Sequence, residues 1–275
     1  MVCYAMRCFA HRLGLHTLVS DEPRLRQREA GGSESAAHRG HGYHGASSSR
    51  SGSADLLLEA GFALNLPDTA LRQCMQQCNI AFLLGPHFHQ AMQRVKNARQ
   101  QLGIRTLFNL LGPLLNPAQA KKQVVGVFSK QWLKPIAGVL ANLGSEHALV
   151  LHSHDGLDEI SIAACTDVIE YHENVFKQWT LNPDDYGCSH ANLDAIIVET
   201  PAESLALAES VFAGSKGPAR DIVLLNTAAA LYCSDSRTGF AGAVEKAANA
   251  IDSGLASKRF NQLRELTKHL APKEA

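Results

Sequence analysis

Apolar residues recur with two different spacings along most of the chain. Over residues 54–60 and 67–78 they return at intervals of three and four, which is typical of amphipathic helices. Short apolar runs rich in β-branched residues, at 124–128, 148–151 and 195–198, instead predict buried strands. Because strands alternate with helices, the pattern predicts an α/β fold with a mostly parallel sheet flanked by helices.

Local signals mark where several helices begin and end. Ser53 is a suitable N-cap for the first helix, and Gly61 is a suitable stop. The sequence from Thr200 to Glu203 is a capping box with proline at the first helical position. Residues 221–233 are apolar on nearly every side, which predicts a fully buried helix. Helical spacing also extends over three further stretches, 90–101, 132–143 and 244–270.

The composition changes near the start of the chain. There is no Ile, Lys or Asn before Asn65, and residues 1–50 contain seven arginines and five histidines without sustained periodicity. We therefore divide the chain into an aberrant or disordered segment, 1–47, and an α/β body, 48–270. Helices predicted without intervening strands across roughly 66–102 would join a partial small helical subdomain.

Charge and cysteine content exclude several classes of protein. Lys and Arg together number 26, as do Asp and Glu, so no overall field would attract nucleic acid or an anionic membrane. Seven scattered cysteines without a CxxC pair argue against a disulfide framework and for a reducing, cytoplasmic location. Cys74 and Cys78 lie one helical turn apart, but without further ligands they predict packing, not zinc binding. No apolar run approaches the ~20 residues that a membrane span needs.

Two loops combine residue types that suit a phosphorylated substrate. Residues 47–53 are rich in Ser and Gly and directly precede a helix, so hydroxyls and a helix N-terminus could hold phosphate. Asp155-Gly-Leu-Asp158-Glu159 follows a predicted strand, and its adjacent carboxylates suit Mg²⁺ shared with substrate phosphates. A flexible linker and a solvated acidic turn are the alternatives for these two loops.

Two further features lie between these loops. His89 and Arg99 are ten residues apart, close to three helical turns, so their side chains could face the same way. An arginine can grip a carboxylate with two parallel hydrogen bonds. The apolar run 108–117 contains one Gly and two Pro, which predicts a buried, turn-rich loop.

Four of these features together resemble the anthranilate phosphoribosyltransferases in both order and spacing. They are the runs SSRSGSADLL (48–57), FNLLGPLLNP (108–117) and DGLDEI (155–160), and the pair His89 and Arg99. The resemblance covers about residues 48–270. It implies a homodimeric enzyme of tryptophan biosynthesis that needs Mg²⁺. Such an enzyme transfers the phosphoribosyl group from 5-phosphoribosyl 1-pyrophosphate to the amine of anthranilate, releasing pyrophosphate.

The resemblance also implies roles for single residues. The matching positions are Asp158 and Glu159 for the metal, Arg99 and His89 for anthranilate, and Ser48, Ser49 and Ser53 for phosphoribosyl pyrophosphate. We assign no catalytic acid or base, because the implied chemistry depends mainly on positioning and electrostatic stabilisation.

Upstream of Ser48 the resemblance ends abruptly. The family places Lys-His-Gly-Asn-Arg before the serines, whereas residues 41–45 read His-Gly-Tyr-His-Gly, with His44 in place of the asparagine. The glycine-rich pyrophosphate loop of the family, its metal-binding serine segment and its opening helices have no counterpart. We interpret 1–47 as a reading-frame or gene-model fault. We therefore predict negligible transferase activity, because the donor loses its backbone N–H cradle.

Three other functions fit parts of the pattern. A pyrimidine nucleoside phosphorylase-like enzyme shares the Ser/Gly-rich stretch, and binding of thymidine instead of anthranilate would identify it. A non-catalytic binding protein on the same scaffold is the second, although the balanced charge gives no basic footprint for nucleic acid. The third is a metal hydrolase built on His87 with His89 and His152 with His154, for which we favour surface or pocket-lining roles.

Overall fold

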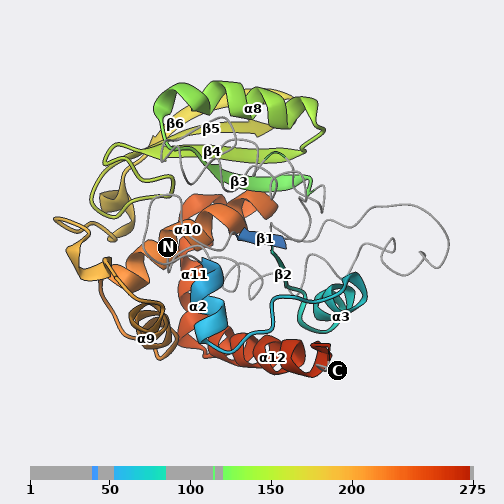
Figure 1. The fold of residues 1–275 in the computed structure, drawn as a ribbon. Coiled ribbons are helices and arrows are strands. Elements are labelled where there is room, and N and C mark those ends of the chain that lie inside the picture. Colours follow the sequence, from blue (N-terminus) through green and yellow to red (C-terminus); the bar gives the residue numbers. More distant parts are fainter. Residues whose placement is uncertain (1–38, 43–52, 85–113, 115–119, 273–275) are drawn as a thin grey trace, which may run out of the picture.

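The structure is a computed structural model that describes residues 39–42, 53–84, 114 and 120–272 (Figure 1). Within these residues a four-stranded sheet lies between two layers of helix. Helix α8 (Leu133–Asn142) covers one face, and α10 (Pro218–Ser234) covers the other. The remaining helices extend away from the α10 side of the sheet. This arrangement confirms the predicted α/β fold with a sheet flanked by helices.

The four-stranded sheet has the order β3-β4-β5-β6. Its strands are β3 (Lys122–Gly126), β4 (His147–Ser153), β5 (Thr166–His172) and β6 (Val175–Leu181). β3 and β4 are parallel and are joined by the crossover helix α8. β4 pairs antiparallel with β5, and β5 with β6.

The sheet is therefore mixed, which corrects the prediction of a mostly parallel sheet. Glu173 and Asn174 form the two-residue turn between β5 and β6, and both have positive φ, 51° and 63°. Positive φ at both positions gives the tight hairpin turn that matches strand twist, and so short a link can join only antiparallel strands. Most of β6 is exposed, so its residues lack the apolar run by which we recognised the buried strands.

Two further strand assignments differ from the sequence prediction. The strand expected at 195–198 is wrong, because the backbone turns there into a 3-10 helix, Asp194–Ile196, with Ile196 N–H bonded to the Leu193 carbonyl. Conversely, β2 (Ala81–Leu84) is a strand that the pattern did not indicate. It pairs in parallel with β1 (Arg39–Gly42), so four residues of segment 1–47 take part in strand pairing.

The helix signals at 200–203, at Gly61 and over 221–233 are found in the structure, whereas the helix predicted at 90–101 lies outside the described residues. The capping box that opens α9 is complete, because Glu203 N–H donates to Thr200 Oγ1 (3.2 Å) and the Glu203 carboxylate accepts from Thr200 N–H (3.2 Å). Gly61 follows the first helix with φ 83°, and Gly254 with φ 72° divides the last helical stretch in two. The helices other than α8 and α10 are α2 (Ser53–Glu59), α3 (Asp68–Cys78), α9 (Pro201–Phe212), α11 (Gly239–Asp252) and α12 (Leu255–Leu270).

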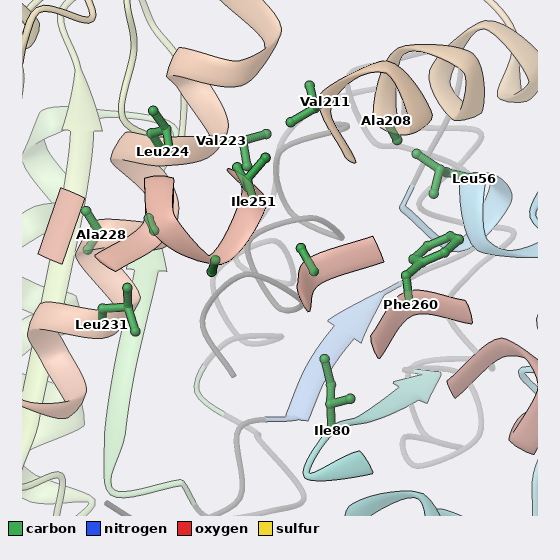
Figure 2. Packing of buried hydrophobic residues seen from close by; sticks show 14 of the residues in the cluster. Leu56, Ile80, Ala208, Val211, Val223, Leu224, Ala228, Leu231, Ile251 and Phe260 are labelled. Carbon is green, nitrogen blue, oxygen red and sulfur yellow. The ribbon is translucent and has the colours of Figure 1, made fainter. Parts of the chain in front are cut away.

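The main hydrophobic core joins the helices to the inner face of the sheet (Figure 2). Leu224 and Leu231 of α10 face the strands, while Leu56 of α2 lies beside Ala208 and Phe260. A second, smaller core lies between α8 and the outer face of the sheet. None of the helices in the described part of the chain has the length and apolar surface of a membrane span.

Candidate functional site

An acidic loop, residues 155–159, leaves the carboxyl end of β4 and leads towards β5. Asp155 stabilises this loop from within, because its carboxylate accepts hydrogen bonds from Leu157 N–H (3.3 Å) and from the Ser161 hydroxyl. Gly156 adopts φ 92°, a conformation that favours glycine. Asp155 is therefore committed to holding the loop, whereas Asp158 and Glu159 are not part of this network.

Asn226 fixes the loop from below. Its side chain is fully buried in α10, and its Oδ1 accepts from Ile160 N–H (2.9 Å) while its Nδ2 donates to the Ile160 carbonyl (2.8 Å). The same amide also donates to the Ile222 carbonyl of its own helix (3.0 Å). One side chain thus satisfies both backbone groups of the residue directly after Glu159. We did not recognise Asn226 from the sequence, although a lone amide in a helix that is otherwise apolar all round is a usable signal.

Gly126 allows the same loop to approach β3. A Cβ atom at this position would overlap the backbone carbonyl of Asp158, so no other residue fits without moving one of the two backbones. Gly126 ends β3, and the next residue, Val127, donates its N–H to the Leu151 carbonyl of β4 (2.9 Å). The acidic loop therefore packs directly against the carboxyl ends of the two parallel strands.

Asp158 is exposed and Glu159 is half-buried. Within the described residues neither carboxylate forms a hydrogen bond or an ion pair. Two adjacent carboxylates on a fixed backbone offer the oxygen ligands that Mg²⁺ prefers, and a Mg²⁺ site usually completes its coordination with water and substrate phosphates. The donor chemistry of this pair therefore fits Mg²⁺.

Only part of the predicted site lies within the described residues. Ser53 begins α2 and is half-buried. The buried residues Leu56 and Ile160, from α2 and the end of the acidic loop, belong to the same hydrophobic core. The other predicted positions lie outside the described residues: Ser48, Ser49, His89, Arg99 and, apart from Leu114, the run 108–117.

The histidines beside the acidic loop have separate partners. His152 Nδ1 lies 2.8 Å from the Val127 carbonyl oxygen, and His154 Nε2 lies 3.1 Å from Asp167 Oδ2. Lys130 Nζ contacts the same carboxylate oxygen of Asp167 at 2.7 Å. His152 and His154 therefore do not share a metal site, so this half of the metal-hydrolase alternative is not supported. The other half, His87 and His89, lies outside the described residues.

Cys74 and Cys78 occupy the buried face of α3, as predicted for packing residues. Burial and the neighbouring Cys78 raise the pKa of the Cys74 thiol to about 11. A neutral, buried thiol is a poor nucleophile, which agrees with a packing role for this pair.

Comparison with known proteins places this architecture in a class. The a/b domain of a glycosyl transferase family matches residues 32–257, and the chain belongs to this family. The anthranilate phosphoribosyltransferase of Legionella pneumophila (strain Paris) is 63% identical over 81% of the chain. That of Halorhodospira halophila (strain DSM 244 / SL1) is 40% identical over 88% of the chain and 70% of the relative. The chain spans less than two thirds of the Legionella relative, 65% of its length.

Solved structures agree with this placement. An anthranilate phosphoribosyltransferase from Thermus thermophilus aligns with a TM-score of 0.81 and 32% identity, covering 96% of this chain and 72% of that one. The enzyme from Saccharomyces cerevisiae in complex with PRPP and Mg aligns with a TM-score of 0.80 and 27% identity, covering 98% and 70%.

Proposed function

We propose that this chain is an anthranilate phosphoribosyltransferase of tryptophan biosynthesis. It would transfer the phosphoribosyl group of 5-phosphoribosyl 1-pyrophosphate to the amine of anthranilate. The observation that carries the proposal is the acidic loop, which Gly126 and Asn226 hold at the carboxyl end of β4 with Asp158 and Glu159 unpaired among the described residues. The names of the relatives identify the substrates for which such a loop would serve.

In this proposal Asp158 and Glu159 hold Mg²⁺, which when bound would neutralise charge on the pyrophosphate leaving group. The fixed backbone keeps the two carboxylates in place, so little reorganisation is needed when the donor arrives. By resemblance, Arg99 and His89 bind anthranilate, and Ser48, Ser49 and Ser53 contact the donor. We also propose a homodimer, which rests on the resemblance alone.

We further propose a cytoplasmic location and impaired activity. A reducing compartment is supported by the sequence, in which seven scattered cysteines include no CxxC pair. Impairment is supported by the sequence of segment 1–47, where no glycine-rich pyrophosphate loop can be recognised.

The test compares the full chain with a chimera in which residues 1–47 are replaced by the N-terminal part of the Legionella pneumophila (strain Paris) relative, up to the position that corresponds to Ser48. With anthranilate, phosphoribosyl pyrophosphate and Mg²⁺ present, we expect the chimera to consume anthranilate. The decrease in anthranilate fluorescence measures this rate. The full chain should not consume anthranilate. A folded but inactive chimera would contradict the assigned function, and equal rates for both proteins would contradict impairment.

A second comparison tests the proposed metal-binding role of Asp158 and Glu159. In the chimera, Asp158→Asn with Glu159→Gln should lower the rate about 100-fold or more, because a preorganised electrostatic contact to the leaving group is lost. Asp184→Asn with Asp185→Asn is the matched control, since these residues are also adjacent carboxylates and both are exposed. If both double variants lose activity equally, the effect is one of general charge and the assignment of Asp158 and Glu159 fails.

A further inference from the structure

A second group of potential metal ligands lies at the other end of β4. His147 begins this strand and His172 ends β5, and the two residues are directly opposite in the antiparallel pair. Glu170 precedes His172 by two residues, so its side chain lies on the same face of the sheet. With β4 seven residues long, this group is about 20 Å from the acidic loop at the other end of the strand.

The three side chains converge. Each offers one ligand atom, and these atoms all lie within 4.8 Å of one another; no other such group of three occurs within the described residues. The rings of His147 and His172 stack with centroids 4.2 Å apart, so both imidazoles lie on one side of the sheet, and one ring must rotate before both can bind the same ion. His147 Nε2 lies 3.0 Å from Glu170 Oε1. In a tetrahedral zinc site, two donors bonded at about 2.1 Å are separated by about 3.4 Å, so a small shift of these side chains would admit an ion.

Glu170 is held in the orientation that a metal ligand needs. The indole N–H of Trp179 donates to its Oε2 (2.9 Å), and the hydroxyl of Tyr232 donates to its Oε1 (2.9 Å). Metal-binding carboxylates are commonly held by outer hydrogen bonds of this kind. Burial acts to raise the pKa of Glu170, but the hydrogen bonds from His147, Tyr232 and Trp179 together lower it.

Solvent access to the group and the placement of nearby lysines also favour the binding of a metal ion. His147 and Glu170 are buried, with 1% and 4% of their surface exposed, whereas His172 is half-exposed and opens the group to solvent. Two lysines lie opposite members of the group in strand register. Lys122, opposite His147, donates its ammonium to the Ser234 carbonyl (2.7 Å). Lys177, opposite Glu170, is exposed and forms no ion pair with Glu170.

We propose that His147, Glu170 and His172 form a binding site for zinc or a similar divalent transition metal. Two imidazoles and one carboxylate are a donor set that suits Zn²⁺, and the nitrogen ligands disfavour Mg²⁺. Binding requires the tautomer of His147 that leaves Nε2 unprotonated, so the hydrogen bond to Glu170 is exchanged for bonds to the metal. The ion would link β4 to β5 and, through Tyr232, to α10. This proposal is independent of the transferase activity.

The test uses the full chain, stripped of metal with EDTA and titrated with Zn²⁺ against a chromophoric chelator. We expect one equivalent to bind, and we expect Glu170→Gln and His172→Asn to lower the affinity about 100-fold or more. Tyr232→Phe, which removes only an outer hydrogen bond, should cost about 10-fold. Saturating Zn²⁺ should raise the thermal midpoint of the full chain but not that of Glu170→Gln. Circular dichroism checks that each variant is folded.

Two controls separate this site from other ligands. His190→Asn removes another histidine that is paired with a carboxylate, Asp221 at 2.7 Å, and should leave the affinity unchanged. A thiolate charge-transfer band in the spectrum of the Co²⁺-substituted protein would indicate cysteine ligands. We expect no such band. The proposal fails if no equivalent binds, if His172→Asn binds as tightly as the unaltered chain, or if the thiolate band appears.

Discussion

The two ends of β4 use carboxylates in opposite ways. At the amino end, Glu170 is buried and both of its oxygens accept hydrogen bonds from His147, Tyr232 and Trp179. At the carboxyl end, the carboxylates of Asp158 and Glu159 have no partner among the described residues, and the backbone around them is fixed. At the amino end of β4 the side chains are held by hydrogen bonds. At the carboxyl end the backbone is held, and the two carboxylates have no partner among the described residues.

The difference follows from the cost of burying charge. A buried carboxylate must be hydrogen-bonded, because an unpaired one loses its hydration without compensation. An exposed carboxylate needs no partner and remains able to bind a cation. The fixed backbone at Asp158 then limits the entropy that is lost when a ligand binds. The acidic loop therefore has the properties expected of the proposed substrate site, whereas the Glu170 group has those of a structural network, at which we propose that an ion binds.

The largest effect should come from removing Glu170. Glu170→Ala leaves His147, Tyr232 and Trp179 without their acceptor, and breaking a buried pair in this way costs about 3–5 kcal/mol. Urea denaturation in EDTA, followed by circular dichroism, measures this loss of unfolding free energy without a metal contribution. Glu146→Ala, at an exposed position, should change it by less than about 0.5 kcal/mol. A loss below about 1 kcal/mol for Glu170→Ala would show that the network contributes little.

Removing Asn226 tests how the acidic loop at the carboxyl end of β4 is held in place by α10. Asn226→Ala leaves the N–H and carbonyl of Ile160 without their partner, and we expect a loss of about 2–3 kcal/mol in unfolding free energy. Asn249→Ala is the matched control, because this exposed asparagine on α11 should be close to neutral or slightly stabilising. Equal stabilities for the two variants would mean that water replaces Asn226 and that the loop is not held by it.

Local signals in the sequence predicted much of the fold. The capping box at Thr200 and the apolar stretch 221–233 give helices because the information lies within a few residues. The hairpin of β5 and β6 was missed because its turn uses Glu173 and Asn174 instead of glycine, and because β6 is mostly exposed. The run 195–198 was mistaken for a strand because a short apolar run does not distinguish a strand from a packed turn.

The site was predictable only in part, for a related reason. Asp158 and Glu159 are neighbours in sequence, so their joint chemistry is visible there. Gly126 and Asn226 act on the loop from 32 and 66 residues away, and their roles depend on which elements pack together. The pairing of His147 with Glu170 likewise depends on strand register, which no local pattern specifies.

A pH titration should sharpen the contrast between the two ends. The folded-state pKa of Glu170 is lowered, so its contribution to stability is complete above the ordinary glutamate pKa of about 4.3 and is lost as the pH falls through the folded value. In EDTA, the stability difference between the unaltered chain and Glu170→Gln should therefore be constant from about pH 7 to 5 and shrink below that range. A difference that stays constant down to about pH 3 would contradict a lowered pKa.

The smallest effect on stability should come from the acidic pair itself. Asp158→Asn with Glu159→Gln removes two carboxylates that have no partner among the described residues. The unfolding free energy should therefore change by less than about 0.5 kcal/mol, even though the same change should lower the rate of the chimera about 100-fold or more. Urea denaturation without Mg²⁺ measures this directly. A loss above about 1 kcal/mol would mean that these carboxylates stabilise the loop. They would then resemble Glu170, and the distinction between a free substrate site and a structural network would fail.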